Sequence, residues 1–138
     1  MQVQSPIVGK RCLVLDDEFL IALDIQQILE RAGALHVACV ANAAEALKLL
    51  GSGPKFDVAI LDVKLNGSNE KSLGVASLLT SLSIPFVFLT GMRADDMHAR
   101  LFPQAPVVEK PYDAVALLEA AGRVLSRVRT NAAVRPSS

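Results

Sequence analysis

The sequence contains few of the residues that mark several specialised protein classes. Its 138 residues include no tryptophan, one tyrosine and two cysteines. Two cysteines without metal-ligand spacing exclude a zinc motif and are too few for a disulfide framework. We expect Cys12 and Cys39 to be small buried apolar residues in two neighbouring strands.

An excess of charge and long apolar runs are lacking as well. The 14 basic and 14 acidic residues give a formal net charge of zero, so the basic excess of nucleic-acid-binding domains is missing. No apolar run approaches the roughly 18 residues of a membrane-spanning helix. Residues 1–10 lack the charged and then apolar pattern of a signal peptide. These features predict a cytoplasmic protein with no nucleic-acid or membrane partner.

What the sequence does have is a regular alternation of short apolar runs and helical patterns. Such runs are typical of buried parallel strands. Strands are expected over 11–15, 36–40, 58–61, 85–89 and 107–109, and helices over 19–32, 43–50, 73–82, 95–101 and 114–128, with a turn at Asn66 and Gly67. Five successive β-α units predict a single α/β domain with a doubly wound parallel sheet and right-handed crossovers.

Polar side chains follow four of these strands at the point where each one ends. Asp16 and Asp17 follow the first strand, Asp62 the third, Thr90 the fourth and Lys110 the fifth. Because the carboxyl ends of parallel strands meet at one edge of a sheet, these side chains should converge there. The acidic pair stands where a dinucleotide-binding fold has a glycine-rich loop. Acid there repels a phosphate unless a cation lies between them, which favours a metal site.

The residue types at this edge predict phosphoryl transfer. Three carboxylates in one cleft are costly without a divalent cation, and oxygen-only ligands favour a hard ion such as Mg²⁺. Lys110 adds a compact positive charge suited to a phosphoryl group, and Thr90 adds a hydroxyl donor. One carboxylate could attack phosphorus while the other groups stabilise the phosphoryl oxygens.

Four motifs carry a resemblance to the receiver domain of two-component response regulators. They are Leu13-Val-Leu-Asp-Asp-Glu18, Asp57-Val-Ala-Ile-Leu-Asp62, Phe88-Leu-Thr-Gly91 and Glu109-Lys-Pro-Tyr112. The resemblance implies a flavodoxin-like (CheY-like) five-stranded parallel sheet of order 2-1-3-4-5 with five helices. The resemblance covers the receiver domain over residues 10–128, and the residues outside it predict an N-terminal leader over 1–9 and, by composition, a disordered tail over 129–138.

The resemblance also implies a role for each polar residue. Asp62 is the phosphoacceptor that takes a phosphoryl group from a histidine kinase. Asp17 binds Mg²⁺ directly, together with Asp62, and Asp16 holds a metal-bound water. The backbone carbonyl of Lys64 completes the protein's share of the coordination.

Two further residues, at the ends of the fourth and fifth strands, are expected to read the phosphorylated state. Thr90 is the switch hydroxyl, and Lys110 contacts the phosphoryl group, with a cis bond between Lys110 and Pro111. Many receivers carry an aromatic residue in the fifth strand three residues before this lysine, but here Val107 stands at that position. The readout is therefore expected to differ from the usual one.

The segment 85–91 resembles the single-domain receivers of the alphaproteobacterial FATGUY group, with Leu89 in place of the usual alanine. This resemblance predicts a stand-alone regulator that signals by protein–protein contact or phosphorelay. The partners would be a histidine kinase and a phosphotransfer or downstream effector protein. The expected contact surface is formed by the fourth helix, fifth strand and last helix, and the expected state is a monomer or a weak dimer through that surface.

The chain is expected not to be an enzyme, and two alternatives stay open. Lys64 and Met92 stand where other receivers tune phosphoaspartate hydrolysis, and neither side chain can orient a water, which predicts slow self-dephosphorylation.

One alternative function is that of a receiver-like adaptor that acts without phosphorylation. The other is an aspartate-nucleophile phosphatase, which needs a second carboxylate where Lys64 stands. His98 is expected to be an exposed helix residue.

Overall fold

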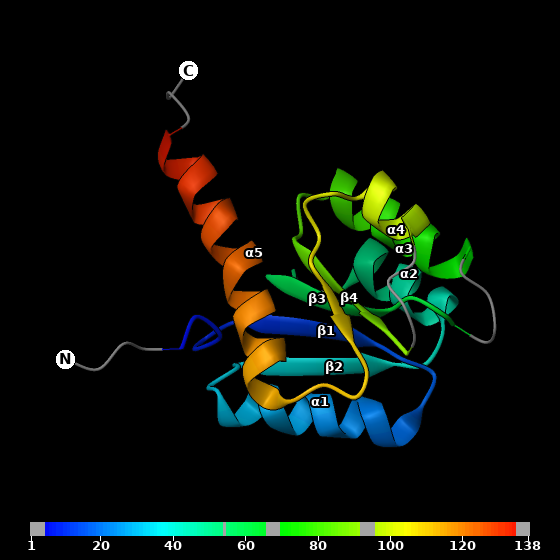
Figure 1. Ribbon diagram of the computed structural model, residues 1–138. Helices are drawn as coiled ribbons and strands as arrows, with labels where there is room; N and C mark the ends of the chain where they lie inside the picture. Colours follow the sequence, from blue (N-terminus) through cyan, green and yellow to red (C-terminus); the bar gives the residue numbers. More distant parts are fainter. Residues whose placement is uncertain (1–4, 54, 66–69, 92–95, 135–138) are drawn as a thin grey trace.

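The described part of the chain folds as five parallel strands that alternate with five helices. A computed structural model describes residues 5–53, 55–65, 70–91 and 96–134. The strands are β1 (Arg11–Leu15), β2 (His36–Val40), β3 (Val58–Asp62), β4 (Phe86–Thr90) and β5 (Val107–Glu109), and the helices are α1 (Phe19–Arg31), α2 (Ala43–Ser52), α3 (Glu70–Ser81), α4 (Asp96–Leu101) and α5 (Ala114–Val134). The strand order is β2-β1-β3-β4-β5 (Figure 1). The predicted flavodoxin-like fold and its strand order are confirmed.

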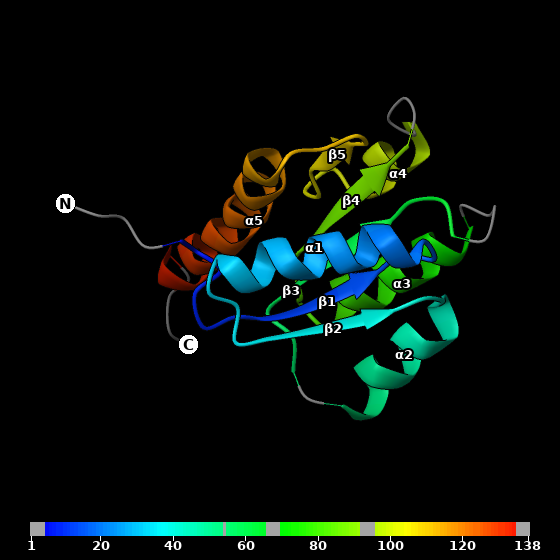
Figure 2. The ribbon, with the colours of Figure 1, turned by 90° about the horizontal axis from the view of Figure 1, so that it is seen from below.

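The helices cover both faces of the sheet. Helices α1 and α5 pack on one face, and α2 and α3 pack on the other (Figure 2). Alternate β1 residues therefore enter different cores: Cys12 and Val14 face α1 and α5, whereas Leu13 and Leu15 face α2 and α3. Strands β3 and β4 are buried along their whole length, which explains their unbroken apolar runs. Each large side chain buried in this way stabilises the fold by about 1.5–3 kcal/mol.

Residues before the first strand contribute to one of these cores. Ile7 is fully buried against the cluster that includes residues of α1 and α5, although it lies in the expected leader. Close to it, Pro6 lies against Gly122 of α5, where an added Cβ would come within 2.9 Å of Pro6 Cγ. The segment that precedes β1 is thus packed onto the domain as far back as these residues.

Three helix ends differ from the sequence-based expectation by two residues or more. Helix α3 begins at Glu70, three residues earlier than expected, because the polar residues of its first turn show no apolar periodicity from which its start could be predicted. Helix α2 continues through Gly51 to Ser52. Helix α5 continues to Val134, since no proline or glycine interrupts the chain between Gly122 and Pro136. The expected tail is therefore helical as far as Val134, and residues 135–138 lie outside the described residues. None of the described helices meets the length and apolarity that crossing a membrane requires.

Two expectations about burial were wrong. Cys12 is buried, but Cys39 is exposed because β2 is the edge strand and α1 covers it only in part. His98 was expected to be exposed, yet it is fully buried, with its ring edge-on to Phe88 at a centroid distance of 4.8 Å. Helix α4 is too short to reveal an inward face by periodicity, and a histidine in it is easily assigned to solvent. The turn expected at Asn66 and Gly67 lies outside the described residues.

Candidate functional site

The polar residues predicted to converge lie together at the carboxyl ends of the strands. Asp16 directly follows β1, and Asp62 and Thr90 are the last residues of β3 and β4. Lys110 directly follows β5. Asp16 and Asp62 are buried, with only 2% and 3% of their surface exposed, whereas Asp17 is exposed. The parallel topology thus gathers side chains from four strand ends.

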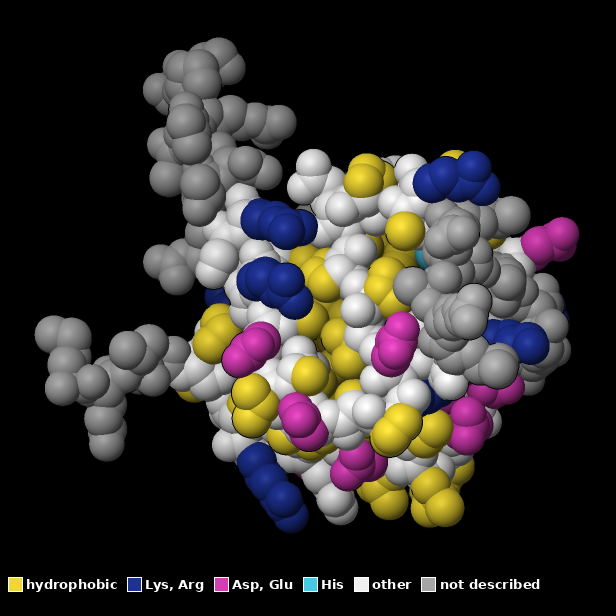
Figure 3. Space-filling view, viewed as in Figure 1, with side chains coloured by type: hydrophobic (Ala, Val, Ile, Leu, Met, Phe, Trp, Pro, Cys, Tyr) yellow, Lys and Arg dark blue, Asp and Glu magenta, His cyan; other side chains and the backbone are white. Residues whose placement is uncertain are grey.

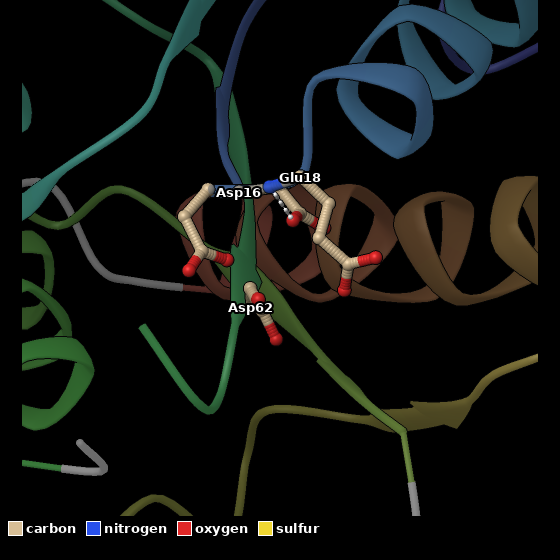
Figure 4. A group of neighbouring side chains, drawn as sticks. Asp16, Glu18 and Asp62 are labelled. Carbon is tan, nitrogen blue, oxygen red and sulfur yellow. Dashed lines mark hydrogen bonds between the residues drawn. The ribbon is translucent and has the colours of Figure 1, made fainter. Parts of the chain in front are cut away.

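Lys110 joins the acidic residues of β1 and β3. Its Nζ atom lies 3.3 Å from Asp16 Oδ2, 3.5 Å from Asp62 Oδ1 and 3.7 Å from Glu18 Oε1. The Lys110 side chain is mostly buried, so solvent screens these interactions weakly. Figure 4 shows the labelled carboxylates of Asp16 and Glu18 beside that of Asp62. One ammonium group therefore serves three carboxylates.

Backbone hydrogen bonds fix the orientation of these groups. Asp16 Oδ1 accepts a 2.9 Å hydrogen bond from the N–H of Glu18, and Asp62 Oδ1 accepts a 3.3 Å hydrogen bond from the N–H of Lys64. The N–H of Lys110 donates to the carbonyl oxygen of Thr90 at 2.7 Å, which brings the backbones of these two residues together. The bond between Lys110 and Pro111 is cis, as the resemblance implied.

The loop that follows Lys110 is also tied to α1. The hydroxyl of Tyr112 donates to Asp24 Oδ2 at 3.1 Å. Burial of the Tyr112 phenol, together with the nearby Asp24 carboxylate, raises the pKa of its hydroxyl. The hydroxyl therefore keeps its proton and its hydrogen bond at neutral pH. This contact helps to hold the backbone next to Lys110 against the first helix.

The carboxylates are electrostatically costly without a cation. Burial, and then the negative charge of Asp16, raises the pKa of Asp62 to about 7, although Lys110 opposes the shift. Burial likewise raises the pKa of Asp16. Burial lowers the pKa of Lys110, but the charges of Asp62 and Asp16 outweigh this effect and leave its pKa raised. Lys110 alone does not balance the negative charge of the site.

The donor set fits a hard divalent cation. Asp16, Asp17, Glu18 and Asp62 each offer a carboxylate oxygen, and these atoms all lie within 4.8 Å of one another. Mg²⁺ prefers such oxygen ligands and keeps several of its waters. Glu18 was not among the predicted site residues, and its proximity to Lys110 adds it to the site. The run of three consecutive acids after the first strand was the signal for it.

Two positions singled out in the sequence are placed less fully. Lys64 lies two residues after Asp62 and has an exposed side chain, so the side chain does not enter the cluster. Thr90 is buried at the end of β4. Met92 lies outside the described residues.

Comparison with known proteins identifies the family. The family model described as the response regulator receiver domain matches residues 12–122. The chain belongs to this family. Receiver domains are phosphoaccepting signalling modules of two-component systems that interact with histidine kinases and effectors, and they typically bind Mg²⁺ at an acidic pocket. The resemblance stated from the four sequence motifs is therefore confirmed.

Solved receiver structures share the fold over most of the chain. The solution structure of SdrG from Sphingomonas melonis Fr1 is 36% identical, with a TM-score of 0.68, and the match covers 85% of this receiver domain chain and 97% of SdrG. A response regulator receiver protein from Sinorhizobium medicae WSM419 is 27% identical, with a TM-score of 0.73, over 86% of this chain and 95% of that one.

Curated relatives are longer than the matched region. The regulator PhyR of Methylorubrum extorquens is 23% identical over 72% of this chain and 38% of PhyR. PdtaR of Mycobacterium tuberculosis is 30% identical over 88% of this chain and 60% of PdtaR. The receiver domain thus spans 38% to 60% of the length of these two relatives. Membership of the FATGUY group stays a prediction.

Proposed function

We propose that this receiver domain accepts a phosphoryl group from a histidine kinase on Asp62 in the presence of Mg²⁺. The observation that carries the proposal is the position of Lys110, whose Nζ atom lies within 3.5 Å of two carboxylates, one directly after β1 and one at the end of β3. An ammonium group in this place binds phosphoryl oxygens once the phosphoryl group arrives, because its charge is already directed at the acceptor. The output is protein–protein contact or phosphorelay.

The transfer requires only a nucleophile and charge stabilisation. The Asp62 carboxylate attacks phosphorus, an O–P bond forms, the P–N bond to the donor histidine breaks, and the electron pair returns to the imidazole nitrogen. Lys110 stabilises charge on the phosphoryl oxygens, and Thr90 offers its hydroxyl to them. Asp16, Asp17, Asp62 and the carbonyl of Lys64 would hold Mg²⁺, which compensates the negative charge of acceptor and phosphoryl group when bound.

The phosphodonor partner is expected to contact the start of α1. Phe19 and Leu20 directly follow the acidic run, and 76% and 75% of their surface is exposed. Hydrophobic side chains stand out at the lower right of Figure 3, where α1 begins. Large exposed apolar side chains beside a reaction site are typical of a contact surface. A kinase or phosphotransfer protein docked here could present its phosphohistidine to Asp62.

A second surface is proposed for output. It comprises α4, β5 and α5, where Leu101 and Val115 are exposed. Contact of this surface with an effector, or weak dimerisation through it, would transmit the phosphorylated state. That the domain acts without an attached output domain stays a prediction.

The phosphorylated state is proposed to be long-lived. An attacking water needs a group that orients it, and Lys64 offers neither a carboxylate nor a carboxamide. We therefore expect the purified phosphoprotein in Mg²⁺ to lose its phosphoryl group over minutes or longer. A half-life of seconds would contradict this.

Phosphorylation by a small-molecule donor tests the proposed function directly. The protein is incubated with acetyl phosphate and Mg²⁺, and the acyl phosphate is measured by intact-protein mass spectrometry. We expect one hydroxylamine-sensitive phosphoryl group in the native protein and none in Asp62→Asn. Asp57→Asn is the matched control, because Asp57 lies directly before the start of β3, at the other end of the strand from Asp62. Its carboxylate accepts a hydrogen bond from the N–H of Arg11. An unmodified native protein would favour the adaptor alternative, and turnover of a phosphomonoester would favour the phosphatase.

A further inference from the structure

A series of hydrogen bonds, mostly buried, connects Asp62 with α4. The N–H of Lys64 donates to Asp62 Oδ1 at 3.3 Å, and the carbonyl of the same peptide, which belongs to Val63, accepts from Ser72 Oγ at 2.6 Å. Ser72 Oγ in turn lies 2.9 Å from His98 Nε2. Ser72 and His98 are fully buried. These hydrogen bonds therefore run from the end of β3 through α3 to α4, part-buried at Asp62 and fully buried at Ser72 and His98.

The direction of these hydrogen bonds follows from the chemistry of the hydroxyl. Ser72 has one hydroxyl hydrogen, which it donates to the carbonyl of Val63. The contact with His98 must then be a donation from the Nε2–H of His98 to Ser72 Oγ. All donors point toward the Asp62 carboxylate. Hydrogen bonds aligned in this way polarise one another, so a change at one end alters the others.

The peptide between Val63 and Lys64 makes the coupling mechanical as well. It is a rigid plane with the N–H bonded to Asp62 and the carbonyl bonded to Ser72. Any rotation that lengthens one bond also displaces the other. The preceding peptide is fixed, because the N–H of Val63 donates to the carbonyl of Leu89 in β4 at 2.8 Å. The peptide between Val63 and Lys64 is therefore the part of this segment that can rotate.

We propose that the chain from Asp62 through Ser72 to His98 transmits phosphorylation to α4. The proposal rests on the proposed function of Asp62. Phosphorylation replaces a carboxylate charge by an acyl phosphate whose carboxyl oxygens accept hydrogen bonds less strongly, which weakens the bond from Lys64. Ser72 and His98 are then positioning residues, and Phe88 keeps the histidine ring in place through its edge-on contact. These hydrogen bonds provide a route to α4 in a receiver domain in which Val107 stands in place of the usual aromatic residue of the fifth strand.

Nuclear magnetic resonance of the full chain tests this route. The probe is beryllofluoride with Mg²⁺, and the signals are the amide of Lys64, the Nε2–H of His98 and the amides of Ala99 and Arg100 in α4. In the native protein we expect all of them to shift. In Ser72→Ala we expect the Lys64 amide to shift still, while the response of His98 and α4 is lost. Ser81→Ala, which removes another α3 hydroxyl bonded to a backbone carbonyl, should behave like the native protein.

The possible outcomes separate this inference from the proposed function. An equal response of α4 in Ser72→Ala and in the native protein would overturn the proposed hydrogen-bond route. A His98 signal that does not shift with beryllofluoride, although acetyl phosphate still modifies Asp62, would overturn it as well. A native protein that takes no phosphoryl group from acetyl phosphate overturns both. If Ser72→Ala does not fold, His98→Gln and His98→Phe answer the same question: the amide donor should keep the α4 response and the phenyl ring should lose it.

Discussion

Lys110 Nζ lies 3.5 Å from Asp62 Oδ1, although Lys110 follows β5, Asp62 ends β3, and β4 lies between these two strands. The contact spans two strand spacings because the lysine side chain is long enough to cross the end of β4. It exists only in this parallel order, in which both strands end at the same edge. The electrostatic balance of the site therefore depends on the topology of the whole sheet.

Removing the ammonium group should impair both phosphorylation and stability. In Lys110→Ala, Asp16 and Asp62 stay buried but lose their cation, and the free energy of unfolding at pH 7 should fall by about 1–3 kcal/mol. Phosphorylation by acetyl phosphate should slow by about 10²-fold, because a charge directed at the phosphoryl oxygens is lost. Lys48→Ala, which removes an exposed lysine of α2, is the control and should change neither quantity. Equal rates in the two variants would exclude the role assigned to Lys110.

The stability of the metal-free domain should depend on pH through Asp62. Its pKa is raised from an ordinary 3.8 to about 7, so between these values the folded protein holds a proton that the unfolded chain releases. Stability must then fall as the pH rises through this window. Asp16, whose pKa is also raised, adds in the same direction. Thermal unfolding in EDTA should show a lower midpoint at pH 7.5 than at pH 5.

Substitution and metal addition distinguish this effect from general pH sensitivity. Asp62→Asn removes the titrating group and should be more stable than the native protein at pH 7.5 but not at pH 4. Mg²⁺ should raise the unfolding midpoint of the native protein more at pH 7.5 than at pH 5, because it binds the ionised carboxylates. A native midpoint that rises steadily from pH 5 to 7.5 in EDTA would contradict the shifted pKa.

The exposed start of α1 should matter for a protein donor and not for a small one. Phe19→Ser and Leu20→Ser remove apolar side chains that are largely exposed, so stability should change by no more than about 0.5 kcal/mol. Transfer from a phosphorylated histidine kinase or phosphotransfer protein should slow by about tenfold, since apolar anchor residues at interfaces contribute about 1–2 kcal/mol each. The rate with acetyl phosphate should stay as in the native protein.

A matched variant tests whether the position or the apolar character matters. Leu35→Ser also removes an exposed leucine, but Leu35 precedes β2 and so lies at the amino ends of the strands, away from the acidic site. Its transfer rate from the protein donor should equal the native rate. If all three variants slow the transfer equally, the effect is not local to α1 and the proposed docking surface is wrong.

The sequence was most informative where a residue type and a strand end coincide. Asp16, Asp62 and Lys110 could be placed together because the apolar runs located the strands and the α/β topology located their ends. His98 could not be placed, since its burial depends on Phe88 and Ser72, which are distant in sequence. Cys39 was misplaced for a related reason: the residue pattern of a strand does not say how far a helix covers the edge of the sheet.

The last prediction compares Gly74 and Gly122, two glycines that lie in helices. An added Cβ would contact a neighbouring residue only at Gly122. At Gly74 in α3 an added methyl meets nothing within 4 Å, so Gly74→Ala should stabilise the domain by about 1 kcal/mol through helix propensity. At Gly122 in α5 the methyl would lie 2.9 Å from Pro6 Cγ, which forces the segment before β1 to move. Gly122→Ala should therefore lower the unfolding midpoint and speed hydrogen exchange at Val8, whose amide donates to the carbonyl of Ser5. Equal stabilisation by both substitutions would show that the packing of Pro6 and Ile7 contributes little to the core.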